Sequence, residues 1–149
     1  MEKTFHMLLY RVSHAMRGYL RPHIGELGLG SGQPKLVAYL AAHGPCRQKE
    51  LADYFEIDPA AVSRMLDIMR KAGFVTCRTD EHNRRSDVVE LTEKGRKANE
   101  RWQEYCREME NVMLQGFAAE EREVFAQYLS RAYRNFKGRQ SGEGAAEHE

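Results

Sequence analysis

The sequence has little cysteine, tryptophan or proline: its 149 residues include three Cys, one Trp and four Pro. Cys46, Cys77 and Cys106 lie about thirty residues apart and lack CxxC spacing, which indicates neither a disulfide framework nor a zinc knuckle. The six histidines are dispersed, and none falls at the i, i+4 spacing that would place two metal ligands on one helical face. We therefore expect free thiols, no metal site and no cofactor.

Long hydrophobic runs are also absent. No segment approaches the roughly 18 uninterrupted apolar residues of a membrane span, and the N-terminus lacks the basic start and apolar region of a signal peptide. The sequence also lacks a phosphate loop, a GxSxG elbow, an HExxH motif and a dinucleotide fingerprint. These absences predict a cytoplasmic protein that has no membrane partner and is not an enzyme.

An excess of charge of either sign is missing as well, since the net charge is +1. This value neither requires nor excludes a nucleic-acid partner, because DNA binding needs basic groups on one face rather than a basic total. Within residues 46–91 the acids even slightly outnumber the bases. Their placement is uneven. Glu50, Asp53 and Glu56 lie in the first part of this stretch, and basic side chains cluster later, at Arg64, Arg70, Lys71, Arg78, Arg84 and Arg85.

What the chain does have is helical periodicity over most of its length. Apolar residues recur with helical spacing from residue 5 to about residue 24, before a glycine-rich loop. A second helix is predicted over 33–43, with Pro34 in its first turn, and a third begins near Arg47. The fold class is therefore mainly α, with a small β component.

Residues 58–91 carry the most informative local pattern. Asp58 and Pro59 predict the start of a helix, and Gly73 predicts its left-handed end. The period then changes to two over 74–79 and again over 87–91, which predicts two strands. Their connector is longer and more charged than a tight hairpin turn requires. With the helix before it, this order outlines a winged helix-turn-helix domain over residues 33–92.

Amphipathic helical segments flank this domain. Residues 1–32 and 93–138 carry more aromatic and aliphatic surface than a small winged domain can cover, so we expect a dimerisation region there. Packing of these segments within one subunit, as a helical bundle, is the alternative. Residues 139–149 are rich in Gly, Ser, Ala and Glu without a large apolar group, which predicts a disordered tail.

The helix that follows Asp58 has the residue types of a helix that enters the major groove of DNA. Such a helix needs short or hydrogen-bonding side chains near its start. Longer basic side chains behind them can then contact the phosphates. Arg64 is our candidate for direct readout of a guanine, and Ser63 for a base edge or phosphate. The predicted DNA-binding residues of this helix are Pro59, Ala60, Ala61, Ser63, Arg64 and Arg70.

The connector between the two strands lifts two adjacent cations away from the body of the domain. A narrow minor groove concentrates negative potential, so one arginine can enter it while the other binds phosphate. The predicted DNA-binding residues of this wing are Arg78, Asn83, Arg84 and Arg85. An ordinary solvated helix face and a solvated arginine pair are the alternatives when each feature is taken alone.

Five pieces of the sequence, in order and spacing, resemble the MarR family of bacterial transcriptional regulators. They are Gln48–Ala52, Asp58–Asp67, Gly73–Val75, Asp80–Arg85 and Leu91–Gly95. The resemblance implies a homodimer whose winged domains read the two halves of a pseudo-palindromic operator in double-stranded DNA, most simply as a repressor. The family often has aspartate where this chain has Asn83, so the resemblance does not tell which of Arg84 and Arg85 enters the groove.

Many members of the family release DNA when a small phenolic or anionic effector binds between the dimerisation region and the winged domain. The residues that we expect to line such a crevice here are His14, Arg17, His23 and Tyr39. Two other functions stay open. A winged domain can bind protein instead of DNA, and Cys46 lies beside Arg47 and Lys49, where a lowered pKa would make it a redox sensor. Cys77 and Cys106 are expected to be inert buried thiols.

Overall fold

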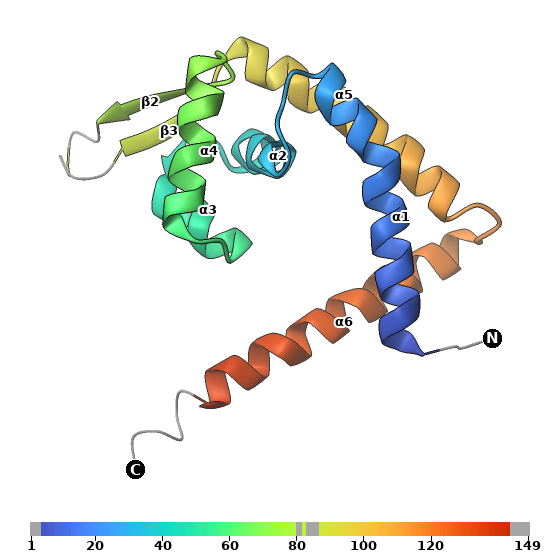
Figure 1. Cartoon of the computed structure of the whole chain (residues 1–149). Coiled ribbons are helices and arrows are strands. Elements are labelled where there is room, and N and C mark those ends of the chain that lie inside the picture. Colours follow the sequence, from blue (N-terminus) through green and yellow to red (C-terminus); the bar gives the residue numbers. More distant parts are fainter. Residues whose placement is uncertain (1–3, 80–81, 83–86, 144–149) are drawn as a thin grey trace. The chain divides into compact units, whose positions relative to one another are not determined.

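The chain is helical at both ends and carries a small antiparallel sheet near its middle (Figure 1). The computed structural model describes residues 4–79, 82 and 87–143. Its elements are α1 (Phe5–Glu26), α2 (Gln33–His43), β1 (Cys46–Arg47), α3 (Gln48–Phe55), α4 (Pro59–Lys71), β2 (Val75–Thr79), β3 (Asp87–Leu91), α5 (Glu93–Met113) and α6 (Ala119–Glu143). They form two compact units, Met1–Glu110 and Asn111–Glu149.

Helix α4 begins and ends where the sequence predicts. The Asp58 side chain accepts a hydrogen bond from the Ala60 amide at 3.2 Å, as an N-cap does. At the other end Gly73 has a positive φ of 87°, and the Phe74 amide donates to the Met69 carbonyl at 2.9 Å. This pairing is the glycine-terminated Schellman motif, which turns the chain sharply into β2.

The sheet has three strands in the order β1-β3-β2, and both pairs are antiparallel. Strands β2 and β3 are the two that the sequence predicts, with Val75 opposite Leu91 and Thr79 opposite Asp87. Strand β1 was not predicted: the third helix starts at Gln48, and Cys46 and Arg47 pair with Val89 and Val88. A two-residue strand has no periodicity for sequence reasoning to detect.

The hydrophobic core of the first unit lies inside the winged domain. Its largest fully buried side chains come from α2, α3, α4, β2, β3 and the turn after α4: Phe74, Leu36, Leu51, Met69, Val37, Val62, Val75 and Val89. Helix α4 contributes Val62, Leu66 and Met69, which follow one another at helical spacing. This packing holds α4 in place and leaves its opposite face in solvent.

Helix α5 contacts α1 within the same unit. The Tyr105 hydroxyl donates to the Glu26 carboxylate at 2.7 Å, and the Tyr105 ring stacks on His23 with 3.9 Å between centroids. Arg101 lies over the same ring at 4.5 Å. The hydrogen bond from Tyr105 is the main reason that the pKa of Glu26 is lowered. This cluster joins the C-terminal end of α1 to the middle of α5.

The second unit consists of the end of α5 and all of α6. The Glu121 carboxylate accepts from the Ala118 amide at 2.8 Å, and Arg122 donates to the Leu114 carbonyl at 3.3 Å, which fixes the turn before α6. The helix continues to Glu143, so residues 139–143 are helical although we assigned them to a disordered tail. Residues 144–149 of that predicted tail lie outside the described residues.

Two of the three cysteines differ from expectation. Cys77 is exposed on β2, so its assignment as a buried thiol was wrong, and Cys106 is half-buried rather than buried. Over the described parts of the chain, no helix is long and apolar enough to cross a membrane. The same residues contain no cluster of three or more His, Cys, Asp or Glu side chains that would hold a metal ion.

Candidate nucleic-acid interface

The solvent-facing side of α4 holds most of the residues that the sequence predicts for base contact. Pro59, Ala60, Ser63 and Arg64 are exposed, and Ala61 is half-buried at the edge of this face. Small residues in the first turn leave room for close approach, and the hydroxyl and guanidinium that follow can hydrogen-bond. The helix therefore presents a surface that fits a major groove.

The cations of α4 do not all have the same freedom. Arg70 and Lys71 both bind Asp67, at 2.8 and 2.9 Å. These hydrogen bonds, from Lys71 first and then Arg70, lower the pKa of Asp67, so the carboxylate stays charged at neutral pH. Arg64, in contrast, has no hydrogen bond or ion pair with any described residue. It is the cation of α4 that is available to a ligand without breaking a contact.

The wing is described only at its base. Arg78 is exposed on β2, opposite Val88 of β3. Strand β2 contacts α4, so the basic side chain of Arg78 lies on an element next to that helix (Figure 1). Asn83, Arg84 and Arg85, which the sequence predicts at the tip, lie outside the described residues.

The start of α5 fixes the end of α4 and the base of the wing. The Thr92 hydroxyl donates to the Gly73 carbonyl at 2.6 Å and accepts from the Gly95 amide at 3.1 Å. The Thr92 amide donates to the Phe74 carbonyl at 3.1 Å. The bonds of Thr92 to residues 73 and 74 depend on tertiary packing that the sequence pattern does not disclose.

A cavity of about 540 Å³ lies in the first unit, where α1, the loop after it, the start of α2 and α5 meet. Three cations, Arg17, Arg21 and Lys35, line it, and none of its described lining residues is acidic. The remaining wall is mostly apolar and includes Leu20, Ile24, Leu29, Pro34 and Trp102. An apolar wall with cations at its edge fits a small anion that has an aromatic or aliphatic body.

The four residues predicted for an effector crevice are not gathered in one place. Only Arg17 lines the cavity. His23 belongs to the cluster with Tyr105, and His14 lies near Tyr10 with 6.0 Å between ring centroids. Tyr39 packs against His43 and Tyr54 on the winged domain, at 4.2 and 4.7 Å.

Sequence reasoning missed three lining residues of the cavity: Arg21, Lys35 and Trp102. A signal for Arg21 was present, because it follows Arg17 by four residues and therefore lies on the same face of α1. Lys35 and Trp102 come from other elements. No local pattern connects them with α1.

Cys46 does not have the environment of a reactive thiol. It is buried, and burial, followed by the nearby Glu50 charge, raises its pKa to about 11. The alternative that Arg47 and Lys49 lower this pKa is therefore wrong. A redox sensor needs an accessible thiolate, so Cys46 is not suited to the role.

Known proteins resemble this chain in both sequence and fold. The profile of the MarR family matches residues 31–86, which include the whole of α4. Over nearly its full length the chain resembles a MarR transcriptional regulator from Methanosarcina mazei Go1, with 26% identity and a TM-score of 0.82, covering 89% of this chain and 95% of that one.

The chain is similar to the MarR family of winged helix-turn-helix transcriptional regulators.

Another MarR-family similarity covers much of the chain as well. The HTH-type transcriptional regulator BilQ of Clostridium symbiosum (strain WAL-14163) is 25% identical over 124 residues, which are 82% of this chain and 85% of that protein. A structure of a putative MarR-family regulator from Listeria monocytogenes, complexed with 26mer DNA, has 21% identity and a TM-score of 0.82, covering 90% and 89% of the two chains. The winged helix-turn-helix prediction is confirmed, and this chain, which is similar to the MarR family, is a DNA-binding transcriptional regulator rather than an enzyme.

Proposed function

We propose that this protein is a homodimeric repressor in which the two subunits read the halves of a pseudo-palindromic operator. Helix α4 of each subunit would enter the major groove, and the wing with Arg84 and Arg85 would reach the adjacent minor groove. The observation that carries this proposal is the exposed face of α4, with Ser63 and an unpaired Arg64 among its described residues. The DNA in the Listeria relative's structure supports it.

The exposed apolar side chains of the flanking helices support the homodimer. On α1, Phe5 is 93% exposed and Tyr10 is 64% exposed, and on α6, Phe136 is 72% exposed. Exposed apolar side chains of this kind, on each of the two helices, are characteristic of an interface. A second copy of the chain is the simplest partner, because a two-fold dimer presents two α4 helices to a DNA site that itself has two-fold symmetry.

Selection of duplexes from fragmented genomic DNA by the purified protein tests the proposed function. We expect the bound fragments to share a site with two inverted halves, and the salt dependence of binding to report several phosphate contacts, at about −0.9 in log–log slope for each. Duplex binding that depends on neither the DNA sequence nor the salt concentration would instead point to a winged domain that binds protein.

A wing variant makes this test sharper. Replacing Arg84 and Arg85 with Ala should weaken binding to every duplex and reduce the salt slope by about two contacts. Replacing Arg107 and Arg131 with Ala removes the same charge from α5 and α6 and serves as the matched control. Equal affinities of the wing variant and the wild type for the selected duplex would exclude the proposed wing contacts.

We further propose that a small aromatic anion releases the DNA by binding in the cavity beside Trp102. Arg17, Arg21 and Lys35 supply the positive charge, and the apolar wall accepts the ring. This assignment replaces His14, His23 and Tyr39, which do not line the cavity, with residues that do.

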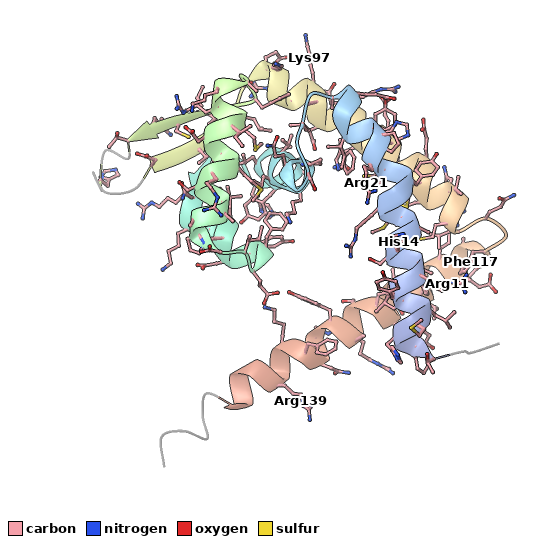
Figure 2. All side chains as sticks on the ribbon, in the orientation of Figure 1. Arg11, His14, Arg21, Lys97, Phe117 and Arg139 are labelled. Atoms are coloured by element: carbon pink, nitrogen blue, oxygen red, sulfur yellow. The ribbon has the colours of Figure 1, made fainter. Side chains whose placement is uncertain are left out.

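Trp102 is the only tryptophan of the chain and lines the cavity, so its fluorescence reports directly on occupancy. Benzoate should change the emission and weaken operator binding, whereas neutral benzyl alcohol should do neither. Arg21→Gln combined with Lys35→Gln should reduce benzoate affinity by about tenfold. Arg11→Gln, a change at a residue of α1 that does not line the cavity (Figure 2), is the control. If Arg21→Gln with Lys35→Gln bound benzoate like the wild type, the cavity would not be the effector site.

A further inference from the structure

A lysine at the start of α5 holds the end of α4. The Lys94 ammonium donates a hydrogen bond to the Ala72 carbonyl at 2.7 Å and lies 4.5 Å from the centroid of the Phe74 ring. Ala72 is the C-cap of α4, where carbonyl groups lack partners within the helix and carry partial negative charge. Lys94 therefore satisfies the end of the helix that carries the candidate base-reading residues.

The backbone of α5 also approaches the segment that follows α4 closely at this point. A Cβ atom at Gly95 would lie 2.2 Å from the Phe74 carbonyl oxygen, so only glycine fits without a shift of the backbone. The Thr92 hydroxyl bonds to the Gly73 carbonyl beside it. Residues 72–74 and 92–95 together form a close contact, which we term the α4–α5 junction.

Farther along, α5 is attached to α1 by the bond from Tyr105 to Glu26. Its first turn is attached to α4, and its middle is attached to α1. Helix α5 thus contacts both the end of α4 and α1. Among the described contacts of the junction, the one from Lys94 is the only one made by a charged side chain.

We propose that Lys94 is a positioning residue for DNA binding, which fixes α4 relative to α5 and so sets the pose in which each subunit presents its recognition helix. The inference rests on the proposed function, because this pose matters only when two α4 helices meet one duplex. Lys94 acts through the Ala72 carbonyl and the Phe74 ring. It does not act by contacting phosphate.

Substitution by Met tests this role, because Met keeps most of the aliphatic stem over Phe74 and removes the ammonium. Lys94→Arg keeps a cationic donor that can still bond to the Ala72 carbonyl. Lys97→Met is the matched control, since Lys97 is an exposed lysine one turn later on α5, and Figure 2 labels it there. Each variant is measured as the full chain, against the duplex that the wild type selects and against a half-site duplex.

We expect Lys94→Met to lower affinity for the full site by about tenfold, affinity for the half-site by less than about twofold, and the salt slope not at all. Lys94→Arg should restore most of the affinity, and Lys97→Met should behave like the wild type. A salt slope reduced by about one contact would show that Lys94 binds phosphate, and equal losses on both duplexes would show a general structural role. Either result would overturn the proposal.

A measurement without DNA separates this inference from the proposed function. The Gly73 and Phe74 amides donate to the Arg70 and Met69 carbonyls at 3.1 and 2.9 Å, so their hydrogen exchange reports on the junction. Exchange at these two amides should be faster in Lys94→Met and unchanged in Lys97→Met. Unchanged exchange in Lys94→Met would overturn the positioning role even if the protein binds its operator, whereas faster exchange in a protein that selects no duplex would leave the junction established and the proposed function wrong.

Discussion

Arg64 and Arg70 lie six positions apart on α4 and differ in what holds them. The Asp67 carboxylate binds Arg70 at 2.8 Å, while Arg64 has no polar partner in the part of the chain that the structure describes. An arginine that must first leave a carboxylate gains less from a DNA contact than one that is free. At the scale of single residues, α4 therefore has one principal candidate for reading a base.

Arg64→Ala should weaken binding and also relax preference at one base position, because a bidentate arginine–guanine contact contributes about 1–3 kcal/mol of discrimination. Competition between the selected duplex and single-base variants of it measures this effect. Arg70→Ala should lower affinity evenly over the same duplexes and serves as the control. An even loss in Arg64→Ala as well would mean that Arg64 contacts only the DNA backbone.

The cysteines allow a second prediction at this scale. Burial, with a smaller contribution from Glu50, raises the pKa of Cys46 to about 11, while Cys77 is exposed and its pKa is raised by partial burial and then by Asp87. Only the thiolate reacts with iodoacetamide, so Cys77 should be labelled before Cys46 in the folded protein near pH ~8. Labelling of Cys46 should accelerate as the pH rises toward its pKa. Mass spectrometry over time, with urea-unfolded protein as the control, checks the order, and earlier labelling of Cys46 would contradict it.

At the scale of elements, features with local causes were predictable from sequence. The ends of α4 follow from Asp58, Pro59 and Gly73, because a cap, a fixed φ and a left-handed turn act within a few residues. Its exposed face follows from helical spacing. The same reasoning could not find Lys94, because its partner Ala72 lies 22 positions away in the sequence.

The cavity shows the same limit. Of the residues predicted for it, only Arg17 lines it, because Arg21, Lys35 and Trp102 are brought together by the packing of three elements. Strand β1 escaped prediction for a related reason, since its two residues are defined by their pairing with β3 and not by any pattern of their own. The exposed face of α4 could thus be predicted from sequence, and the cavity could not.

The close approach of Gly95 on α5 to the Phe74 carbonyl gives a prediction at the scale of elements. Gly95→Ala places a methyl group against the Phe74 carbonyl and should lower the free energy of unfolding by about 1–3 kcal/mol or more. Gly18→Ala on α1, where no atom lies within 4 Å of the added group, is the matched control and should raise it by up to about 1 kcal/mol. Urea unfolding of both variants measures the difference. A neutral effect of Gly95→Ala would show that the junction relaxes easily.

At the scale of the whole molecule, the two ends of the chain present apolar side chains that one copy leaves exposed. They include Phe5, Leu9 and Tyr10 on α1 and Tyr128, Leu129, Tyr133 and Phe136 on α6. Burying such surface in a second copy is favourable by about 25 cal/mol for each Å². Homodimer formation should therefore depend on these two helices.

Leu129→Glu combined with Tyr133→Glu places two charges on the apolar surface of α6 and should convert the dimer to a monomer in sedimentation velocity. The variant should lose affinity for the full operator and keep most of its affinity for a half-site. Ser130→Glu with Asn135→Glu adds the same charge at exposed polar positions of α6 and should remain dimeric. A dimeric Leu129→Glu, Tyr133→Glu variant would show that this surface of α6 lies outside the interface.

The fully buried large side chains all lie between Leu36 and Val89. The winged domain thus carries a core of its own, whereas the flanking helices expose apolar side chains that the proposed dimer would bury. Subunit association stabilises a protein by mass action, so its contribution grows with protein concentration. In calorimetry, heating a dilute and a concentrated sample should reveal one melting transition that moves with concentration and another, belonging to the winged domain, that stays in place.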